Sequence, residues 1–326
     1  MAIITMKSKK NILICGATGF IGKNILLNLC KNKNYKIFAV HNNSKKISLP
    51  NVNWIRADLT NPKIVKKITR NIDILIQAAA TTSGAKDIIN TPYIHVTDNA
   101  IMNSYLLRSA FENKIKHFIF FSCTVMYQSS TKAIKESDYD PSKEIYPKYF
   151  GVANTKLYIE KMCEFFSKIS KTKFTCIRHS NIYGQFDKFD LEKSHFFGAS
   201  VNKVMSAEKE ILIWGDGQEK RDILFIDDLV SFVKGCINKQ KKNFRIYNCG
   251  YGKAFKVKEI IYKIIKSSKK NLVIRNDLTK PSIKTSLFLD CNLAKKELGW
   301  KPRFTLEEGI DKTLVWYKKN FKDVRY

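Results

Sequence analysis

The chain has 326 residues, of which 44% are hydrophobic and 12% aromatic, a composition that excludes a largely disordered protein. No apolar stretch reaches the roughly 18 residues that a membrane-spanning helix needs. Lysine and arginine total 58 against 29 aspartate and glutamate residues, which gives a net charge of +29.

Binding to nucleic acid is one interpretation of this charge. The lysines are dispersed along the sequence, however, with short clusters such as residues 239–242, and aromatic residues do not alternate with them. We therefore favour a lysine-rich solvated surface over a nucleic-acid partner. Its positive field would still attract an anionic cofactor and substrate.

Strand and helix patterns alternate through the first two-thirds of the chain. Apolar runs predict buried parallel strands at 12–14, 36–40, 72–76, 117–122 and 174–178. Helical patterns lie between them at 20–30, 62–70, 97–113 and 149–168. This order predicts an α/β protein with a Rossmann-type doubly wound parallel sheet, formed by a dinucleotide-binding domain over residues 7–180.

From residue 181 onward the alternation loosens. Helices are expected at 194–206, 227–238, 257–267 and 306–319, with short strands at 211–214 and 245–248 among them. The last helix follows Thr305-Leu-Glu-Glu308, a capping-box pattern. We expect residues 181–326 to form mainly a smaller substrate-binding lobe, interleaved at its boundary with the first domain.

A glycine-rich turn joins the first strand to the first helix. Gly16, Gly19 and Gly22 have the spacing that lets a backbone turn tightly and approach a pyrophosphate at a helix N-terminus. Glycines also serve tight turns alone, but their place between a strand and a helix favours a dinucleotide cradle. The turn residues Thr18, Phe20 and Ile21 are then candidate cofactor contacts.

The second strand ends without a carboxylate. An NAD-selective site usually has Asp or Glu there, whereas this segment reads His41, Asn42, Asn43, Ser44, Lys45, Lys46. Because polar and basic side chains can hold a 2′-phosphate, we expect NADP(H), with NAD(H) as the alternative. Further candidate cofactor contacts follow the third and fourth strands, namely Asp58, Leu59, Ala78, Ala79 and Ala80.

Scattered cysteines complete the compositional signals. The eight cysteines form no C-x-x-C pair, which favours reduced thiols in a cytoplasm over a disulfide framework or a metal site. We therefore expect a cytoplasmic protein without a bound metal.

Several motifs in order make the chain resemble the extended short-chain dehydrogenases/reductases that act on nucleotide sugars. Residues 190–195 and 278–281 are most similar to the GDP-fucose synthases, which are epimerase–reductases of GDP-4-keto-6-deoxy sugars. The motifs are the glycine turn 16–22, Asp58, Ala78–Ala80, Asn99, the segment 121–127, Arg178-His-Ser-Asn181-Ile-Tyr-Gly184, Trp214-Gly-Asp-Gly217, residues 221–228 and residues 296–302.

The resemblance implies proton chemistry by a Tyr-x-x-x-Lys pair and a nearby Ser or Thr. Lys156 matches the lysine, which in the family also binds the nicotinamide ribose. Val152 stands where the tyrosine belongs, and it can neither donate nor accept a proton. Tyr149, one helical turn earlier, is a substitute donor, but we favour packing or substrate contact as its role, because about 10 Å of helix rise separates it from Lys156.

The family hydroxyl is also replaced. The matching position holds Cys123, with Ser122 and Thr124 beside it as candidate substrate contacts. In fucose synthases a cysteine and a histidine move protons during epimerisation. His195 matches that histidine, with an ordinary helix-face histidine as the alternative, and Val125 occupies the cysteine position.

The resemblance assigns substrate binding to Asn181, Trp214, Arg221 and His195. Arg221 suits a diphosphate because its guanidinium can form two hydrogen bonds at once; an ion pair with Asp222 or Asp227 is the alternative. We expect Cys123, Lys156 and His195 to be catalytic in an NADP-dependent reductase or epimerase of a GDP-linked keto-sugar, serving surface-polysaccharide synthesis as a homodimer. The alternative is a catalytically degenerate subunit that binds cofactor or nucleotide sugar without turnover.

Overall fold

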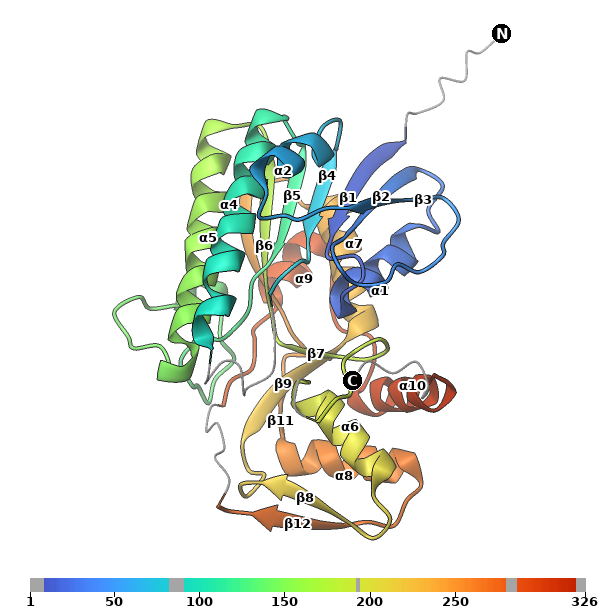
Figure 1. Ribbon diagram of the computed structural model, residues 1–326. Coiled ribbons are helices and arrows are strands. Elements are labelled where there is room, and N and C mark those ends of the chain that lie inside the picture. The colour runs from blue at the N-terminus through green and yellow to red at the C-terminus, as the bar shows by residue number, and fades with distance from the viewer. Residues whose placement is uncertain (1–8, 82–90, 192–193, 280–285, 321–326) are drawn as a thin grey trace.

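The computed structural model describes residues 9–81, 91–191, 194–279 and 286–320. Its main layer is a seven-stranded sheet in which every neighbouring pair of strands is parallel (Figure 1). In sheet order the strands are β10 (Phe244–Cys249), β6 (Lys173–His179), β5 (His117–Phe121), β4 (Ile74–Gln77), β1 (Lys10–Cys15), β2 (Tyr35–His41) and β3 (Val52–Arg56).

The central strands are buried on both faces. Every residue of β4 and β5 is buried, as expected for a parallel sheet covered by helices on each side. In β1, Ile12 and Ile14 belong to one hydrophobic core, whereas Leu13 and Cys15 belong to the other. This alternation, which follows from the two-residue period of a strand, places one core on each face of the sheet.

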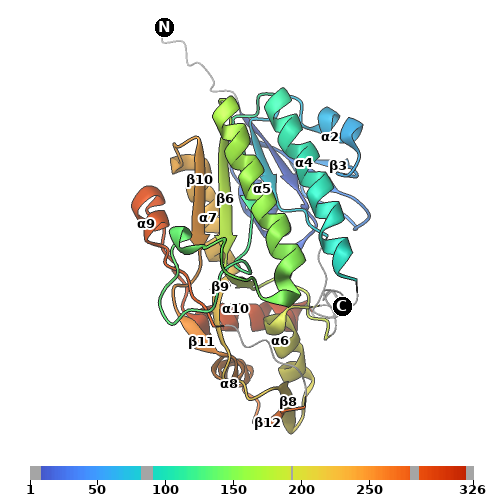
Figure 2. The same ribbon diagram turned by 90° about the vertical axis from the view of Figure 1, so that its left-hand side faces the viewer.

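Two helical layers cover these faces. Figure 2 shows α4 and α5 side by side in front of the sheet. The Leu13 core is covered by α2 (Pro62–Ile68), α4 (Thr97–Glu112) and α5 (Phe150–Ile169), and the Ile12 core by α1 (Phe20–Leu29), α7 (Ile226–Lys239) and α9 (Asn292–Leu298).

Across the described residues, no helix combines the length and the apolarity that a membrane span requires.

A smaller lobe lies beyond the carboxyl ends of the strands, in the lower part of Figure 1. The predicted α/β class, a doubly wound parallel sheet with a smaller C-terminal lobe, is therefore confirmed. The capping box of the last helix is also present: Thr305 Oγ1 accepts from Glu308 N, and the Glu308 carboxylate accepts from Thr305 N. The lobe contains β7 (Asn181–Tyr183), α6 (Phe196–Ser206), β8 (Glu210–Trp214), β9 (Lys220–Phe225), β11 (Ala254–Lys256), α8 (Val257–Ser268), β12 (Val273–Asp277) and α10 (Leu306–Lys319).

The expectation that strand 245–248 lies among the helices of this lobe is wrong. That segment is β10, the edge strand of the large sheet, where it pairs in parallel with β6. The chain leaves the sheet after β6, forms β7 to β9, and returns through α7, which is the crossover that a parallel pair needs. A short apolar run predicts a strand, but it does not identify the partner strand.

A buried ion pair joins α5 to β6. Arg178 Nη2 lies 2.6 Å from Glu160 Oε2, and both side chains are 3% exposed. Ser122, one residue beyond β5, donates its hydroxyl to Glu160 Oε1 at 2.6 Å. Arg178 Nη1 also donates to the Tyr127 hydroxyl oxygen at 2.9 Å. These bonds hold α5, β6 and the segment after β5 as one unit.

The segment after β5 is also bound by residues 286–291, which we call the C-terminal strap. Ile134 N donates to Phe288 O at 2.9 Å, and Asp290 N donates to Ile134 O at 2.8 Å. Asn248 of β10 donates to the carbonyl oxygens of both Ile134 and Asp290, and it accepts a hydrogen bond from Tyr127. Segments far apart in the sequence thus fix the loop that follows β5.

We predict that Arg178→Met destabilises the fold by about 3–5 kcal/mol, because Glu160 becomes a buried charge without its partner. Urea unfolding followed by circular dichroism measures the change. Glu164→Gln is the matched control on the same helix: Glu164 pairs with the exposed Lys161 and Lys168, so its loss should cost less than about 1 kcal/mol. Equal losses in the two variants would contradict the role given to the buried pair.

Candidate active site

The glycine turn packs directly against the end of β4. Gly16 has a φ of +71°, in the left-handed region that favours glycine, and a Cβ there would lie 2.7 Å from Ala79 Cα. A Cβ on Gly22 would overlap the Gly16 carbonyl oxygen. Any larger residue at these two positions would push the turn away from the sheet, so glycine is what allows the turn to pack this closely against β4.

The N-terminus of α1 has the character of an anion site. Gly19 is its N-cap and brings no side chain to bond the free amides, and the first turn contains no acidic residue. The predicted contacts Thr18, Phe20 and Ile21 lie in this turn, each partly exposed. The free N–H groups and the helix dipole favour a pyrophosphate here.

A basic hollow lies beside this turn, at the ends of β2 and β3. It has a volume of about 550 Å³, and no carboxylate lines it. His41, the last residue of β2, is paired in register with Arg56, the last residue of β3. Arg56 was not predicted, although two parallel strands that end together could have indicated it. The lining residues are His41, Asn42, Asn43, Ser44, Lys45, Lys46 and Arg56.

The other predicted cofactor residues lie at the same edge of the sheet. Asp58 is exposed and accepts hydrogen bonds from the Thr60 hydroxyl and amide, which lower the pKa of its carboxyl group. Leu59 is buried beneath it. Ala78 and Ala79 are partly exposed where β4 meets the glycine turn. Contact of these residues, and of Ala80, with a dinucleotide stays a prediction.

Lys156 lies at the carboxyl end of β5. Its Nζ donates to Phe121 O at 2.8 Å and sits 4.7 Å from the centre of the Phe120 ring. Burial lowers the pKa of this ammonium group. Val152, one turn earlier on α5, is partly exposed and apolar. The lysine of the family pair is therefore in place, and the phenol at the usual spacing is absent.

Cys123 lies beside Lys156, close enough for the two charges to interact. Burial raises the pKa of the Cys123 thiol despite the opposing effect of Lys156, so the group stays protonated at neutral pH. Its two neighbours are different. Ser122 is 1% exposed and committed to Glu160, and Thr124 is 8% exposed. The catalytic role of Cys123 and the substrate contacts of Ser122 and Thr124 stay predictions, and the Ser122 hydroxyl is already engaged with Glu160.

One histidine, His179, interacts with this lysine, and a second, His195, interacts with His179. Burial lowers the pKa of His179 to about 4, with further effects from Lys156 and His195. His179 Nδ1 lies 2.8 Å from Ser180 O. His195 is the N-cap of α6, and its side chain is exposed. Sequence reasoning missed His179, although it follows a buried strand at the edge where the other candidates meet.

Tyr149 belongs to the same group. It is the N-cap residue of α5, and its ring lies 5.6 Å from that of Tyr146. Burial raises the pKa of Tyr149, Arg221 opposes this, and Cys123 adds to it. The structure thus brings Tyr149 near both the thiol and Arg221, although Tyr149 precedes Lys156 by two turns of helix.

The smaller lobe supplies Arg221, Asn181 and Trp214. Arg221 is partly buried in β9, where burial lowers its pKa, and Asn181 donates to Asp222 O at 3.2 Å. The Asp222 carboxylate accepts from the backbone amides of residues 251, 252 and 289, so it acts as an anchor for these loops. Trp214 is 54% exposed. These three substrate assignments stay predictions.

Within the described ranges, no group of three or more His, Cys, Asp or Glu side chains is arranged to hold a metal ion. The arrangement instead offers a dinucleotide cradle, a protonated thiol, a neutral imidazole and a lysine at one edge of the sheet. These groups can bind a dinucleotide and transfer protons.

Comparisons with known proteins agree with this chemistry. The sequence pattern of the NAD dependent epimerase/dehydratase family matches residues 12–250. Over 315 residues the chain is 29% identical to the GDP-L-colitose synthase of Yersinia pseudotuberculosis, with 94% of this chain and 97% of that protein covered. It is 26% identical over 327 residues to the GDP-L-fucose synthase of Azorhizobium caulinodans, with 96% and 97% covered.

A solved structure shows the same fold. The UDP-glucose 4-epimerase from Bifidobacterium longum, in complex with NAD+ and UDP, matches with a TM-score of 0.80 and 20% identity, covering 95% of this chain and 99% of that one. The family match spans the glycine cradle, Lys156 and Arg221, and it confirms the resemblance found in the motifs. The chain belongs to the NAD dependent epimerase/dehydratase family, whose enzymes act on nucleotide sugars with NAD(P).

Proposed function

We propose that this protein is an NADP-dependent enzyme that reduces or epimerises, or both, a GDP-linked keto-sugar used for surface polysaccharide. The observation that supports it most is Lys156, held by Phe121 O at the edge of the sheet that also carries the glycine cradle. The two relatives that act on GDP-linked sugars cover almost the whole chain.

Reduction adds a hydride to the carbonyl carbon and a proton to the carbonyl oxygen. A bound nicotinamide would supply the hydride. The chain must deliver that proton. Cys123 is a protonated thiol beside Lys156, and His195, at the start of α6, interacts electrostatically with His179. Epimerisation requires removal of a proton next to the carbonyl and its return on the opposite face, which calls for two such groups.

The basic hollow supports NADP over NAD. Lys45, Lys46 and Arg56 are exposed around it, and charge-assisted bonds from such groups suit a 2′-phosphate. The smaller lobe supports the sugar nucleotide, since Arg221 can hold a diphosphate and the exposed face of Trp214 can stack on a base.

On cofactor choice, NADPH should bind more tightly than NADH in a fluorescence titration. Lys45→Ala/Lys46→Ala should weaken NADPH roughly tenfold or more, because each charge-assisted contact contributes about 1.5 kcal/mol, and should leave NADH unchanged. Lys63→Ala, an exposed lysine at the start of α2, is the control. Tighter NADH binding, or an NADPH affinity that the double variant does not alter, would refute the assignment.

On chemistry, Cys123→Ala and His195→Ala should each lower kcat on a GDP-4-keto-6-deoxy sugar by roughly 10² to 10⁴, the range for loss of a general acid or base. Cys123→Ser should recover part of the rate, because a hydroxyl also donates a proton. Thermal unfolding must be unchanged in each variant. If Tyr149→Phe alone loses activity while the other variants keep it, the donor is Tyr149.

A specific observation favours a second candidate function. Val152 removes the family phenol, and the pKa of Cys123 is raised, so the site is also suited to bind cofactor and nucleotide sugar without turnover. Turnover of the keto-sugar with NADPH would exclude this candidate. In its absence, a large gain of reductase activity on Val152→Tyr would identify a degenerated reductase.

We also propose that the protein forms a homodimer through α4 and α5. Their outer surfaces expose Ile101, Phe111, Tyr158, Phe165 and Ile169, each 36–52% accessible. Sedimentation should give about twice the 37.7 kDa of one chain. Phe165→Lys should shift this mass toward the monomer, whereas Tyr262→Lys, at an exposed aromatic position on α8, should not. A monomeric parent protein would rule the interface out.

A further inference from the structure

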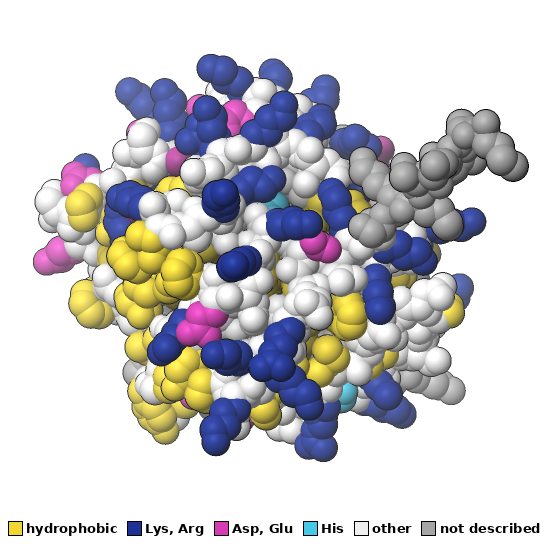
Figure 3. Space-filling view, turned by 90° about the horizontal axis from the view of Figure 1, so that it is seen from above, with side chains coloured by type: hydrophobic (Ala, Val, Ile, Leu, Met, Phe, Trp, Pro, Cys, Tyr) yellow, Lys and Arg dark blue, Asp and Glu magenta, His cyan; other side chains and the backbone are white. Residues whose placement is uncertain are grey.

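The end of the large sheet opposite the glycine cradle is strongly basic. Because the strands are parallel, all of them start at this end, and α1, α2, α4, α5 and α7 end there. We call it the strand-start face, formed by residues 9–11, 30–36, 69–74, 112–118, 168–174 and 238–244. Figure 3 looks down on it and shows many Lys and Arg side chains scattered over the view, fewer acidic ones, and a hydrophobic area toward its left side.

The sequence of these segments accounts for the charge. Asp73 and Glu112 are their acidic residues. The exposed lysines of β1, β2 and the turn before β5 are Lys10, Lys36 and Lys116. The full set of basic residues is Lys9, Lys10, Lys31, Lys33, Lys36, Arg70, Lys114, Lys116, Lys168, Lys171, Lys173, Lys239, Lys241 and Lys242.

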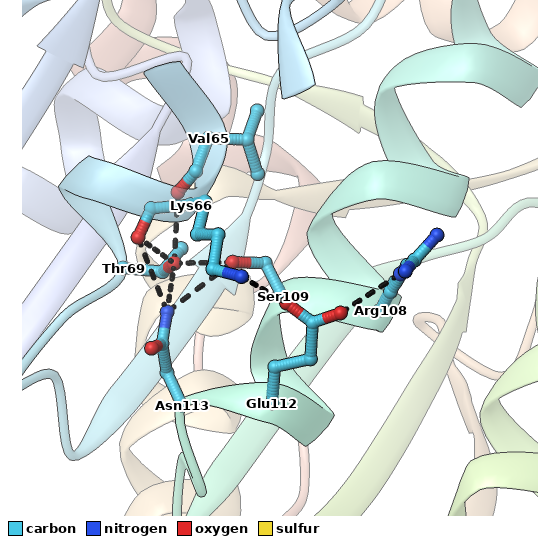
Figure 4. Close-up of polar contacts among 7 residues, drawn as sticks. All are labelled: Val65, Lys66, Thr69, Arg108, Ser109, Glu112 and Asn113. Carbon is cyan, nitrogen blue, oxygen red and sulfur yellow. Dashed lines mark hydrogen bonds and ion pairs between the residues drawn. The ribbon is translucent and has the colours of Figure 1, made fainter. Parts of the chain in front are cut away.

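Both carboxylates are already engaged. Asp73 Oδ1 lies 2.7 Å from Lys116 Nζ. Glu112 accepts from Arg108 Nε at 2.8 Å and lies 3.2 Å from Lys66 Nζ, where the ends of α2 and α4 meet (Figure 4). In the same view, Thr69, the C-cap of α2, is hydrogen-bonded to Ser109 of α4 and to Asn113, the C-cap of α4, which fixes the two helix ends together. Lys168 pairs with Glu164, just outside these segments, and neither Asp73 nor Glu112 pairs with the other lysines of the face except Lys116.

The lysines affect one another at this face. The pKa of Lys173 is lowered by burial and by Lys10. Burial, Lys173 and Lys10 also lower the pKa of His117, to about 3. Repulsion of this kind destabilises the fold unless an anion relieves it.

Helix stability explains part of the pattern but not all of it. Lysines in the last turn of a helix are favourable because they oppose the helix dipole, and Lys66, Lys168 and Lys239 occupy such positions. Lys10 and Lys36 belong instead to the first residues of strands, where no helix dipole is available. The helix dipole therefore does not account for the charge at the strand starts.

We propose that the strand-start face docks on an anionic membrane surface, an interaction separate from the proposed enzymatic function. The face is the common end of one sheet and the helices that flank it, so its charges spread over a broad area and no pocket among them is needed (Figures 1 and 3). Clusters of four to eight lysines or arginines are enough for anionic headgroups.

Nucleic acid fits the same face less well. Single strands bind through exposed aromatic rings between the cations, yet Phe118 and Phe174 are buried here, and Tyr35 and Phe244 are partly buried. Base reading relies on arginine, and Arg70 is the arginine in these segments. Docked on a membrane, the molecule would keep the cradle and the smaller lobe directed into solution, because they lie at the other end of the sheet.

The test is co-sedimentation of the full chain with vesicles of phosphatidylcholine alone and of phosphatidylcholine mixed with phosphatidylglycerol. Lys67→Gln/Lys171→Gln/Lys242→Gln removes three charges from exposed lysines at or beside the face. Lys209→Gln/Lys256→Gln/Lys266→Gln removes the same number from exposed lysines of the smaller lobe. Circular dichroism must show that both variants fold.

The parent protein should bind the mixed vesicles, dissociate from them at high salt and not bind vesicles of phosphatidylcholine alone. Each lysine near an anionic surface contributes roughly fivefold, so the face variant should bind about a hundredfold more weakly, while the lobe variant changes little. Equal losses in both variants, equal binding to neutral vesicles, or no binding to anionic vesicles at low salt would overturn the proposal. Binding of duplex DNA or RNA that the face variant abolishes, without vesicle binding, would assign the face to nucleic acid.

Discussion

The common direction of the seven strands is the constraint on which the rest of the molecule depends. Each parallel pair requires a crossover, and the crossovers place helices on both faces and bring all carboxyl ends to one edge. The glycine turn, the end of β5 and the start of β7 meet there, although residues 16, 121 and 181 are far apart in the sequence. The same direction brings the lysines of the strand starts together at the opposite edge.

At the carboxyl edge, the chain has the family lysine, Lys156, but has Val152 in place of the family tyrosine. Lys156 is held by a backbone carbonyl of β5, so its position depends on the strand and not on residue 152. Around it, burial favours the neutral form of two groups. It raises the pKa of Cys123, which stays a protonated thiol, and lowers the pKa of His179, which stays an unprotonated imidazole. A protonated thiol can donate a proton and a neutral imidazole can accept one, and neither ability depends on a tyrosine.

Local patterns predicted the features with local causes. The helix at 306–319 and its capping box agree with the structure because one short segment contains every group involved. The cradle was predictable because glycine spacing, strand and helix are contiguous. In contrast, Arg56 lines the basic hollow because β3 is in register with β2, and β10 lies in the large sheet because it pairs with β6. Neither relation can be predicted from a short stretch of sequence.

The same limit applies to buried polar groups. Glu160 follows Lys156 in a family pattern, but its partner Arg178 comes from the next strand. The Ser122 hydroxyl donates to Glu160, so it is engaged inside the core. Burial and partner choice are properties of the assembled core. Tyr149 shows the same limit, because its interaction with Arg221 joins segments that are far apart in the sequence.

The C-terminal strap has a consequence for biosynthesis. The loop after β5 is bound by Phe288 and Asp290, and by Asn248 of the last sheet strand. During translation, a nascent chain that has released the glycine cradle and β5 from the ribosome still lacks these partners. The edge that carries Cys123 therefore becomes ordered only after residues 248–290 have left the ribosome, and a chain truncated before them would expose an unfinished loop to proteases.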